Sequence, residues 1–267
     1  NEFEERTGWN VRVETGSAKE MLSQLEKEEA DWDVAFGVSA DALEEGKEYW
    51  QTGKDAWTGY SAVSFVILYN TNVVTYRELP TGWDSLLEPR WKGRVAVPDP
   101  LKSDMAASVL TEAAKNSEKE EFLDLLAENM QYQMPETFKE VEQGISDGRY
   151  SIGVTSEEAA KAMLAAGQDV DYIDPEEGEC FFEDGTAIRK RTPNLDASEA
   201  FVTYTTCDDT KWLLRTQLLR QPAEDVAAEN DRSDEDLKQR YSRQQEVLNI
   251  WKLIMEEKSG SAHEQEQ

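Results

Sequence analysis

Residues 82–94, GWDSLLEPRWKGR, join two short and largely apolar runs at 62–69 and 93–97. Further runs of this kind lie at 9–14, 33–36, 150–154, 170–173 and 186–189. Amphipathic stretches separate the runs, as at 18–29 and 118–129, where apolar residues recur at helical spacing. Short strands that alternate with helices predict an α/β fold in which helices cover a largely parallel sheet.

The C-terminal part of the chain is predicted to be helical, because strand signals stop after Asp196. Helical patterns cover 198–206, 210–219 and 233–258. The last of these carries an apolar stripe at helical spacing, formed by Leu237, Tyr241, Leu248, Trp251 and Ile254. Residues 259–267 are small and polar, so we expect them to be disordered.

Composition excludes several classes of function. The 267 residues carry 56 Asp and Glu against 28 Lys and Arg, a formal net charge of −28 that opposes binding to nucleic acid or anionic lipid. No apolar stretch approaches the roughly 20 residues of a membrane-spanning helix. The chain begins at Asn1 without a basic or apolar leader, so we expect any export signal or lipid anchor to lie upstream.

Catalytic machinery is not expected. The single histidine, His263, lies in the polar tail, which excludes nucleophile systems that need an imidazole. Neither a glycine-rich nucleotide loop nor a GxSxG elbow occurs, so no catalytic residue, cofactor or metal is predicted. Cys180 and Cys207 fit no metal motif, and they either pair as a disulfide or remain two buried thiols.

Small hydroxyl residues stand where a strand or loop gives way to a helix. Ser17, Thr137 and Thr155 each precede a Glu by three residues, the spacing of a capping box, and Ser39 and Ser103 also stand at expected helix starts. Taken singly, each is expected to be an N-cap.

Taken together, the five helix starts suggest a binding site, because ligands of open α/β sheets bind outside the carboxyl ends of the strands. Helix N-termini offer free N–H groups and partial positive charge. Lys19 and Lys102, beside two of these loops, either add charge or are solvated surface residues. The predicted ligand is small and anionic.

An ordered set of segments carries a family resemblance. It comprises 3–11 (FEERTGWNV), 15–17, 30–34, 66–71, 82–94, 98–103, 147–154, 175–178, 186–188 and 193–202. In this order the segments resemble the ferric-iron-type family of ABC-transporter substrate-binding proteins. The likeness covers about residues 3 to 220, and 82–94 is its most specific piece.

The resemblance implies a type 2 periplasmic-binding fold, in which two α/β lobes joined by a hinge close on a solute. The implied lobes are 1–70 plus 185–232 and 71–184, with hinge crossings near 68–71 and 182–187. Residues 233–258 form a C-terminal helix that packs across or onto a lobe, and 259–267 form the disordered tail. The family's first strand would precede Phe3, so we expect the fold to lack it.

The resemblance also implies which loops line the binding cleft. The implied ligand-binding residues are Ser17, Ala18, Ser39, Ser103, Asp104, Thr137, Thr155 and Ser156. Glu183, close to the hinge, either binds an amino group of the solute or is a surface acid. Iron-binding members have adjacent tyrosines where this chain has Thr155 and Ser156, so the site is more similar to those of relatives that take phosphonates or sugar phosphates.

The resulting interpretation is a monomeric, non-enzymatic solute-binding protein of an ABC importer. Its expected partners are a small anionic solute and a cognate permease. Its expected location is periplasmic or extracellular, with a possible lipid anchor upstream. The alternatives are a ligand sensor that feeds a membrane receptor kinase, a ferric-iron binder, and an enzyme that uses acidic residues with a divalent metal.

Overall fold

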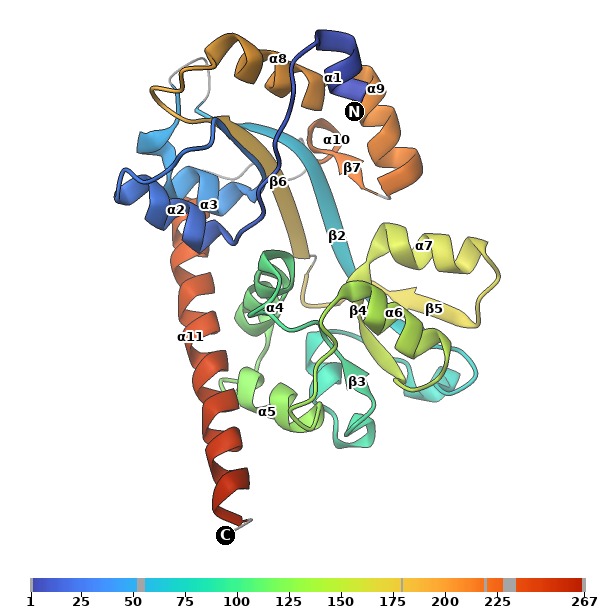
Figure 1. Cartoon of the computed structure of the whole chain (residues 1–267). Helices are drawn as coiled ribbons and strands as arrows, with labels where there is room; N and C mark the ends of the chain where they lie inside the picture. Colours follow the sequence, from blue (N-terminus) through green and yellow to red (C-terminus); the bar gives the residue numbers. More distant parts are fainter. Residues whose placement is uncertain (1, 52–55, 179, 219, 228–233, 266–267) are drawn as a thin grey trace. The chain divides into compact units, whose positions relative to one another are not determined.

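The computed structural model describes residues 2–51, 56–178, 180–218, 220–227 and 234–265. The chain divides into two compact units: unit 1 comprises Asn1–Ala62 and Phe182–Ser242, and unit 2 comprises Val63–Phe181 and Arg243–Gln267. It passes from one unit to the other within strand β2, strand β6 and helix α11 (Figure 1). The first two crossings fall at 62 and 181, where the sequence predicts 70 and 184.

Unit 1 is built on the strand order β1-β6-β2-β7. Its strands are β1 (Val34–Ser39), β6 (Cys180–Ile188), β2 (Thr58–Asn70) and β7 (Gln221–Pro222), and its helices are α1 (Glu2–Thr7), α2 (Ala18–Glu26), α3 (Ala40–Glu45), α8 (Leu195–Thr205), α9 (Asp208–Leu213) and α10 (Ala223–Ala227). A bulge interrupts the antiparallel β1–β6 pair at Gly37, whose φ of 71° favours glycine. The apolar core joins α2, α3 and these strands through Leu22, Leu25, Ala35, Leu43, Trp50 and Ala187.

Unit 2 places β2 between two antiparallel neighbours, β4 (Ile152–Ser156) and β5 (Val170–Ile173). The short strand β3 (Val95–Ala96) pairs with β4 in parallel. Its helices are α4 (Asp104–Asn116), α5 (Phe122–Asn129), α6 (Phe138–Ser146) and α7 (Glu157–Ala165), and α6 and α7 pack against β4 (Figure 1). Helix α11 (Asp234–Gln265) belongs to unit 1 up to Ser242 and to unit 2 from Arg243.

The α/β class is confirmed, but the prediction of a largely parallel sheet is wrong, because among the strand pairs described above only β3–β4 is parallel. β2 runs antiparallel to β4, β5 and β7, and β1 runs antiparallel to β6. Alternation of strands and helices sets the order of the elements and not their direction.

Two local predictions also differ from the structure. Residues 9–14 alternate apolar and polar side chains like a strand, but within this described segment there is none, and Val13 is 78% exposed. A strand pattern without an edge to pair with stays extended coil. The predicted disordered tail is helical as far as Gln265, because α11 continues without an interrupting proline, and elongating a helix costs far less than starting one. Residues 266–267 lie outside the described residues.

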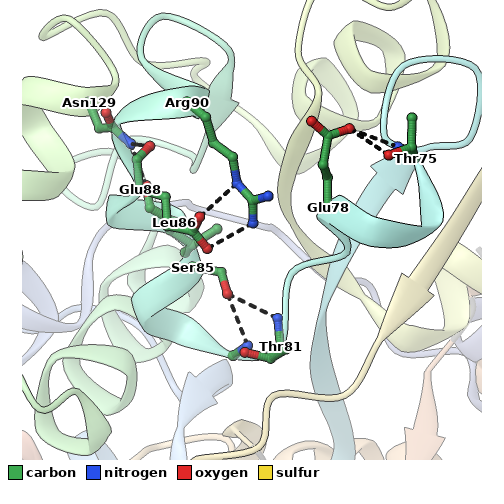
Figure 2. Close-up of polar contacts among 9 residues, drawn as sticks. Thr75, Glu78, Thr81, Ser85, Leu86, Glu88, Arg90 and Asn129 are labelled. Carbon is green, nitrogen blue, oxygen red and sulfur yellow. Dashed lines mark hydrogen bonds and ion pairs between the residues drawn. The ribbon is translucent and has the colours of Figure 1, made fainter.

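The segment 82–94 forms two short 3₁₀ turns in unit 2, Trp83–Leu87 and Pro89–Trp91. Both tryptophans are buried. Ser85 Oγ accepts the backbone N–H groups of Thr81 and Gly82, at 2.9 and 3.4 Å, as Figure 2 shows for the first turn.

Residues distant in sequence hold these turns in place. The side-chain amide of Asn129 donates to the carbonyls of Leu86 and Glu88 at 2.7 and 3.0 Å (Figure 2). The carboxylate of Glu177 accepts the backbone N–H groups of Trp83 and Asp84 at 2.9 and 3.1 Å. The most specific segment of the family resemblance therefore contributes to folding, through caps and buried indoles.

Replacing Asn129 by Ala should lower the free energy of unfolding by about 2–3 kcal/mol, because the buried Leu86 carbonyl and the half-buried Glu88 carbonyl both lose their donor. Urea denaturation followed by circular dichroism measures the loss. Asn72→Ala, at an exposed asparagine of the same unit, is the control and should change stability by less than about 0.5 kcal/mol. Equal effects of the two substitutions would contradict the role given to Asn129.

No described helix is both long enough and apolar enough to cross a membrane.

Candidate functional site

Two helices of unit 2 begin at the same edge of its sheet. Since β3 and β4 are parallel, their carboxyl ends lie together. Helix α7 begins at Glu157, directly after β4. Helix α4 begins at Asp104, after the loop that follows β3. The N-termini of α4 and α7 therefore both come after the carboxyl ends of these two strands, at the same edge of the sheet.

The N-terminus of α6 is tied to both of its neighbours. Phe138, the first residue of α6, stacks on Phe65 with ring centroids 5.4 Å apart, and Phe65 lies opposite Ser156 in the β2–β4 ladder. On the other side, the Asp99 N–H donates to the Pro135 carbonyl at 2.9 Å, which joins the loop before α4 to the loop before α6. Three helix N-termini are thus linked in one part of unit 2.

A hydroxyl caps each of these three helices. Ser103, Thr137 and Ser156 accept the N–H groups of Ala106, Glu140 and Ala159 at 3.2, 3.2 and 3.1 Å. A capping hydroxyl accepts through its oxygen and keeps its own proton to donate. The first N–H groups of each helix lack intrahelical partners. Because Thr137 is exposed and the other two hydroxyls are half-buried, these donors are accessible to a small anion.

The N-cap of α7 is Ser156, so the prediction that Thr155 starts this helix is wrong. Thr155 is a fully buried residue of β4 and donates to Glu142 Oε1 at 2.6 Å. Burial raises the pKa of Glu142, against the lowering effect of the Thr155 hydrogen bond. Two adjacent hydroxyl residues both suit an N-cap, and the end of β4 decides between them. As a solute ligand, Thr155 stays a prediction.

The charged residues near α4 are already engaged. The ammonium of Lys102 pairs with Glu136, and this contact raises the pKa of Lys102. The backbone carbonyl of Asp104 accepts the Gln244 amide at 3.2 Å, and its carboxylate, at the first position of α4, complements the helix dipole. Positive potential at this edge therefore comes from the backbone rather than from a free lysine.

In unit 1 the predicted residues Ser17 and Ala18 lie at a closed helix start. Ser17 forms the predicted capping box: its hydroxyl accepts the Glu20 N–H at 3.2 Å, and its own N–H donates to the Glu20 carboxylate at 2.9 Å. The Ser17 N–H and the Ser17 hydroxyl both donate to the Glu20 carboxylate and lower the pKa of Glu20, and Ala18 is buried. The sequence suggests that the start of α2 offers N–H donors to an anionic solute, but in the structure the Glu20 carboxylate occupies this helix start.

Ser39 and Glu183 are also in unit 1, on neighbouring strands. Ser39 precedes α3 but makes no capping bond, and its buried hydroxyl has no hydrogen-bond partner in the described part of the chain. It lies opposite Asp184 in the β1–β6 ladder. Glu183 is half-buried and its carboxylate lies against Gly59.

Sequence reasoning missed a buried ion pair beside these residues. Asp184 is 2% exposed, accepts the Ser61 hydroxyl at 3.1 Å and pairs with Arg220. Burial raises the pKa of Asp184 to about 6, although Arg220 and Ser61 favour the charged form. A lone acid pair inside the apolar strand β6 was the available signal, since buried acids are almost always partnered.

Neither cysteine is in a disulfide: Cys180 is buried and Cys207 is half-buried. Among the described residues, no three His, Cys, Asp or Glu side chains gather as a metal site would require.

Comparison with known proteins identifies the fold and the family. Over residues 20–245 the sequence matches the family described as bacterial extracellular solute-binding protein. Iron uptake protein A1 of Synechocystis sp. is 23% identical over 262 residues, which cover 86% of this chain and 69% of that protein.

Two solved structures share the fold. The ferric binding protein from Campylobacter jejuni has a TM-score of 0.75 at 16% identity, covering 95% of this chain and 93% of that one. The periplasmic binding protein AfuA from Actinobacillus pleuropneumoniae, with fructose-6-phosphate bound, has a TM-score of 0.76 at 14% identity, covering 96% and 93%. The predicted periplasmic-binding fold is confirmed, and the chain belongs to the bacterial extracellular solute-binding protein family.

Proposed function

We propose that this protein is the solute-binding component of an ABC importer, in the periplasm or outside the cell. Its solute is a small organic anion of the phosphonate or sugar-phosphate class, delivered to a cognate permease without chemical change. The observation that carries the proposal is the meeting of the α4, α6 and α7 N-termini in unit 2, each with a hydroxyl cap.

The energetics of these helix ends suit such a solute. The protein carries a net charge of −28, but exposed charges are screened beyond about 8 Å at physiological ionic strength. A helix N-terminus stabilises a bound anion by about 0.3–1 kcal/mol when the anion is at the surface and by up to about 2 kcal/mol when the anion is partly buried. A hydrogen bond to a charged group contributes about 1.5–3 kcal/mol. Hydroxyl and backbone donors at three helix ends can therefore outweigh the long-range repulsion, and at the start of α6 the Glu140 carboxylate already accepts the Glu136 N–H at 2.8 Å.

The double substitution Ser103→Ala and Ser156→Ala tests this site. Each hydroxyl that no longer donates to the anion should cost about 1.5 kcal/mol of binding free energy, so the double variant should have a dissociation constant raised by roughly 100-fold. Each lost cap should also lower stability by about 0.5–2 kcal/mol. Isothermal titration calorimetry with the organic anion that the wild type binds measures the affinity.

The matched control is Thr75→Ala. Thr75 caps a short turn of the same unit through Glu78, as Figure 2 shows, and its loss should leave affinity unchanged. Unchanged affinity in the Ser103 and Ser156 double variant would place the solute elsewhere. Closure of two lobes on the solute remains a separate prediction, which solution scattering with and without solute can test.

Ferric iron is the second candidate, because the curated relative is an iron uptake protein. A hard ferric ion prefers phenolate and carboxylate oxygens, and the turn at Thr155 and Ser156 offers no phenolate. Stabilisation by ferric citrate, with none by organic anions, would favour iron over the anion proposal.

A further inference from the structure

Glu142 of α6 is held beside the end of β4, in the part of unit 2 where the three capped helix starts meet. Phe138 and Glu142 are four residues apart, so both project from the same face of α6. Phe138 stacks on Phe65, which lies opposite Ser156. Glu142 Oε1 accepts the Thr155 hydroxyl at 2.6 Å. Because Thr155 directly precedes the Ser156 cap, with about 3.8 Å between their Cα atoms, the carboxylate is fixed next to the start of α7.

One oxygen of this carboxylate has no partner in the described part of the chain. Glu142 is half-buried, and among the described residues its Oε2 accepts no hydrogen bond and pairs with no lysine or arginine, although this oxygen reaches solvent. Other shielded acids of unit 2 have a lysine partner: Glu112 pairs with Lys115 at 3.4 Å, and Glu157 pairs with Lys161 at 2.6 Å. Glu142 thus offers a negative charge and a free acceptor.

A partly desolvated carboxylate favours a cationic partner. Burial raises the pKa of Glu142, against the opposing effects of the Thr155 hydrogen bond and the more distant charge of Lys139. A charge removed from water is costly unless it is paired and hydrogen-bonded. An ammonium group on a bound solute would supply both the opposite charge and the donor, in a charge-assisted bond that is stronger than a neutral one. A second anionic group on the solute would be repelled instead.

We propose that Glu142 determines the specificity of the solute site in unit 2, by accepting a hydrogen bond from an ammonium group of the solute. The preferred solute is therefore a zwitterion. Its phosphonate or phosphate group binds at the capped helix starts, and its amino group, at the other end of a short carbon chain, binds Glu142 Oε2. This inference rests on the proposed function and narrows the solute to organic anions that carry an amino group.

Two probes that differ only at one end test this inference. They are 2-aminoethylphosphonate and propylphosphonate, which carries a methyl group in place of the ammonium group. Calorimetry with the full chain at pH 7.5 measures both dissociation constants. The wild type should bind the amino compound at least about tenfold more tightly than propylphosphonate, as expected for a hydrogen bond between charged groups.

Glu142→Gln should abolish this preference, because the side chain becomes neutral. It should bind propylphosphonate at least as tightly as the wild type does, since a nearby negative charge is removed. The amide oxygen can still accept the Thr155 hydroxyl, so the variant should fold, with a Tm no lower than that of the wild type. Glu128→Gln is the matched control: it removes an exposed carboxylate of the same unit, paired with Lys92, and should keep the wild-type preference.

Equal binding of the two compounds by the wild type would overturn the inference, as would a preference for the amino compound that survives in Glu142→Gln. Absence of binding of the amino compound would overturn it as well. Failure here is distinguishable from failure of the proposed function, which is tested at Ser103 and Ser156. Capture of propylphosphonate or fructose 6-phosphate that depends on those two serines, without any preference for the amino compound, would leave the proposed function standing alone.

Discussion

Trp50→Ala is expected to lower the free energy of unfolding by about 3–5 kcal/mol, the usual cost of removing a buried aromatic side chain from a core. Trp50 is fully buried in unit 1, and its indole N–H donates to the Leu43 carbonyl at 2.7 Å. The substitution leaves both a cavity among the residues of α2 and α3 and a carbonyl without its donor.

Urea denaturation monitored by circular dichroism measures this loss. Trp212→Ala is the control, because Trp212 is 58% exposed and should change stability by less than about 0.5 kcal/mol. Similar losses for the two tryptophans would contradict the core assigned to unit 1.

Arg220→Gln is expected to cost about 3–5 kcal/mol at pH 7.5, because it leaves the Asp184 carboxylate buried without its counter-ion. Adding Asp184→Asn should recover most of this stability, since neutral groups of similar shape carry no such desolvation penalty. Urea denaturation of the single and double variants measures both effects. A single variant as stable as the wild type would contradict the burial of this ion pair.

The pH dependence of stability follows from the same carboxyl group. The pKa of Asp184 is raised to about 6 in the folded protein, from an ordinary value of 3.8. The folded state therefore binds more protons between about pH 4 and pH 6, and stability falls as the pH rises through this window. The wild type should lose up to about 3 kcal/mol more than Asp184→Asn between pH 4 and pH 7.5. Parallel pH profiles of the two proteins would contradict the raised pKa.

Features with short-range causes were predictable from sequence. The capping box of Ser17 with Glu20 and the N-cap at Ser103 involve residues at most three positions apart, and both occur in the structure. The choice between Thr155 and Ser156 was not predictable, because it depends on where β4 stops pairing with β2. Local patterns therefore place the hydroxyl caps of α2, α4 and α7 to within one residue.

Features with long-range causes were missed. Asp184 and Arg220 are 36 positions apart, and Glu177 meets Trp83 across 94. The strand pattern at 9–14 failed for the same reason, since strand formation depends on a partner edge that local sequence does not reveal. The sequence therefore suggested the hydroxyl caps of unit 2 but not the buried ion pair of Asp184 with Arg220.

The capture of an organic anion is tested most directly by thermal denaturation of the wild-type chain with methylphosphonate, fructose 6-phosphate, glycerol phosphate or ferric citrate. A ligand at a hundred times its dissociation constant stabilises the folded state by about 2.7 kcal/mol, or about 5–10 °C for a chain of this size. The proposed function predicts such a rise with at least one phosphonate or sugar phosphate. A rise with ferric citrate alone, or none with any of the four, would contradict it.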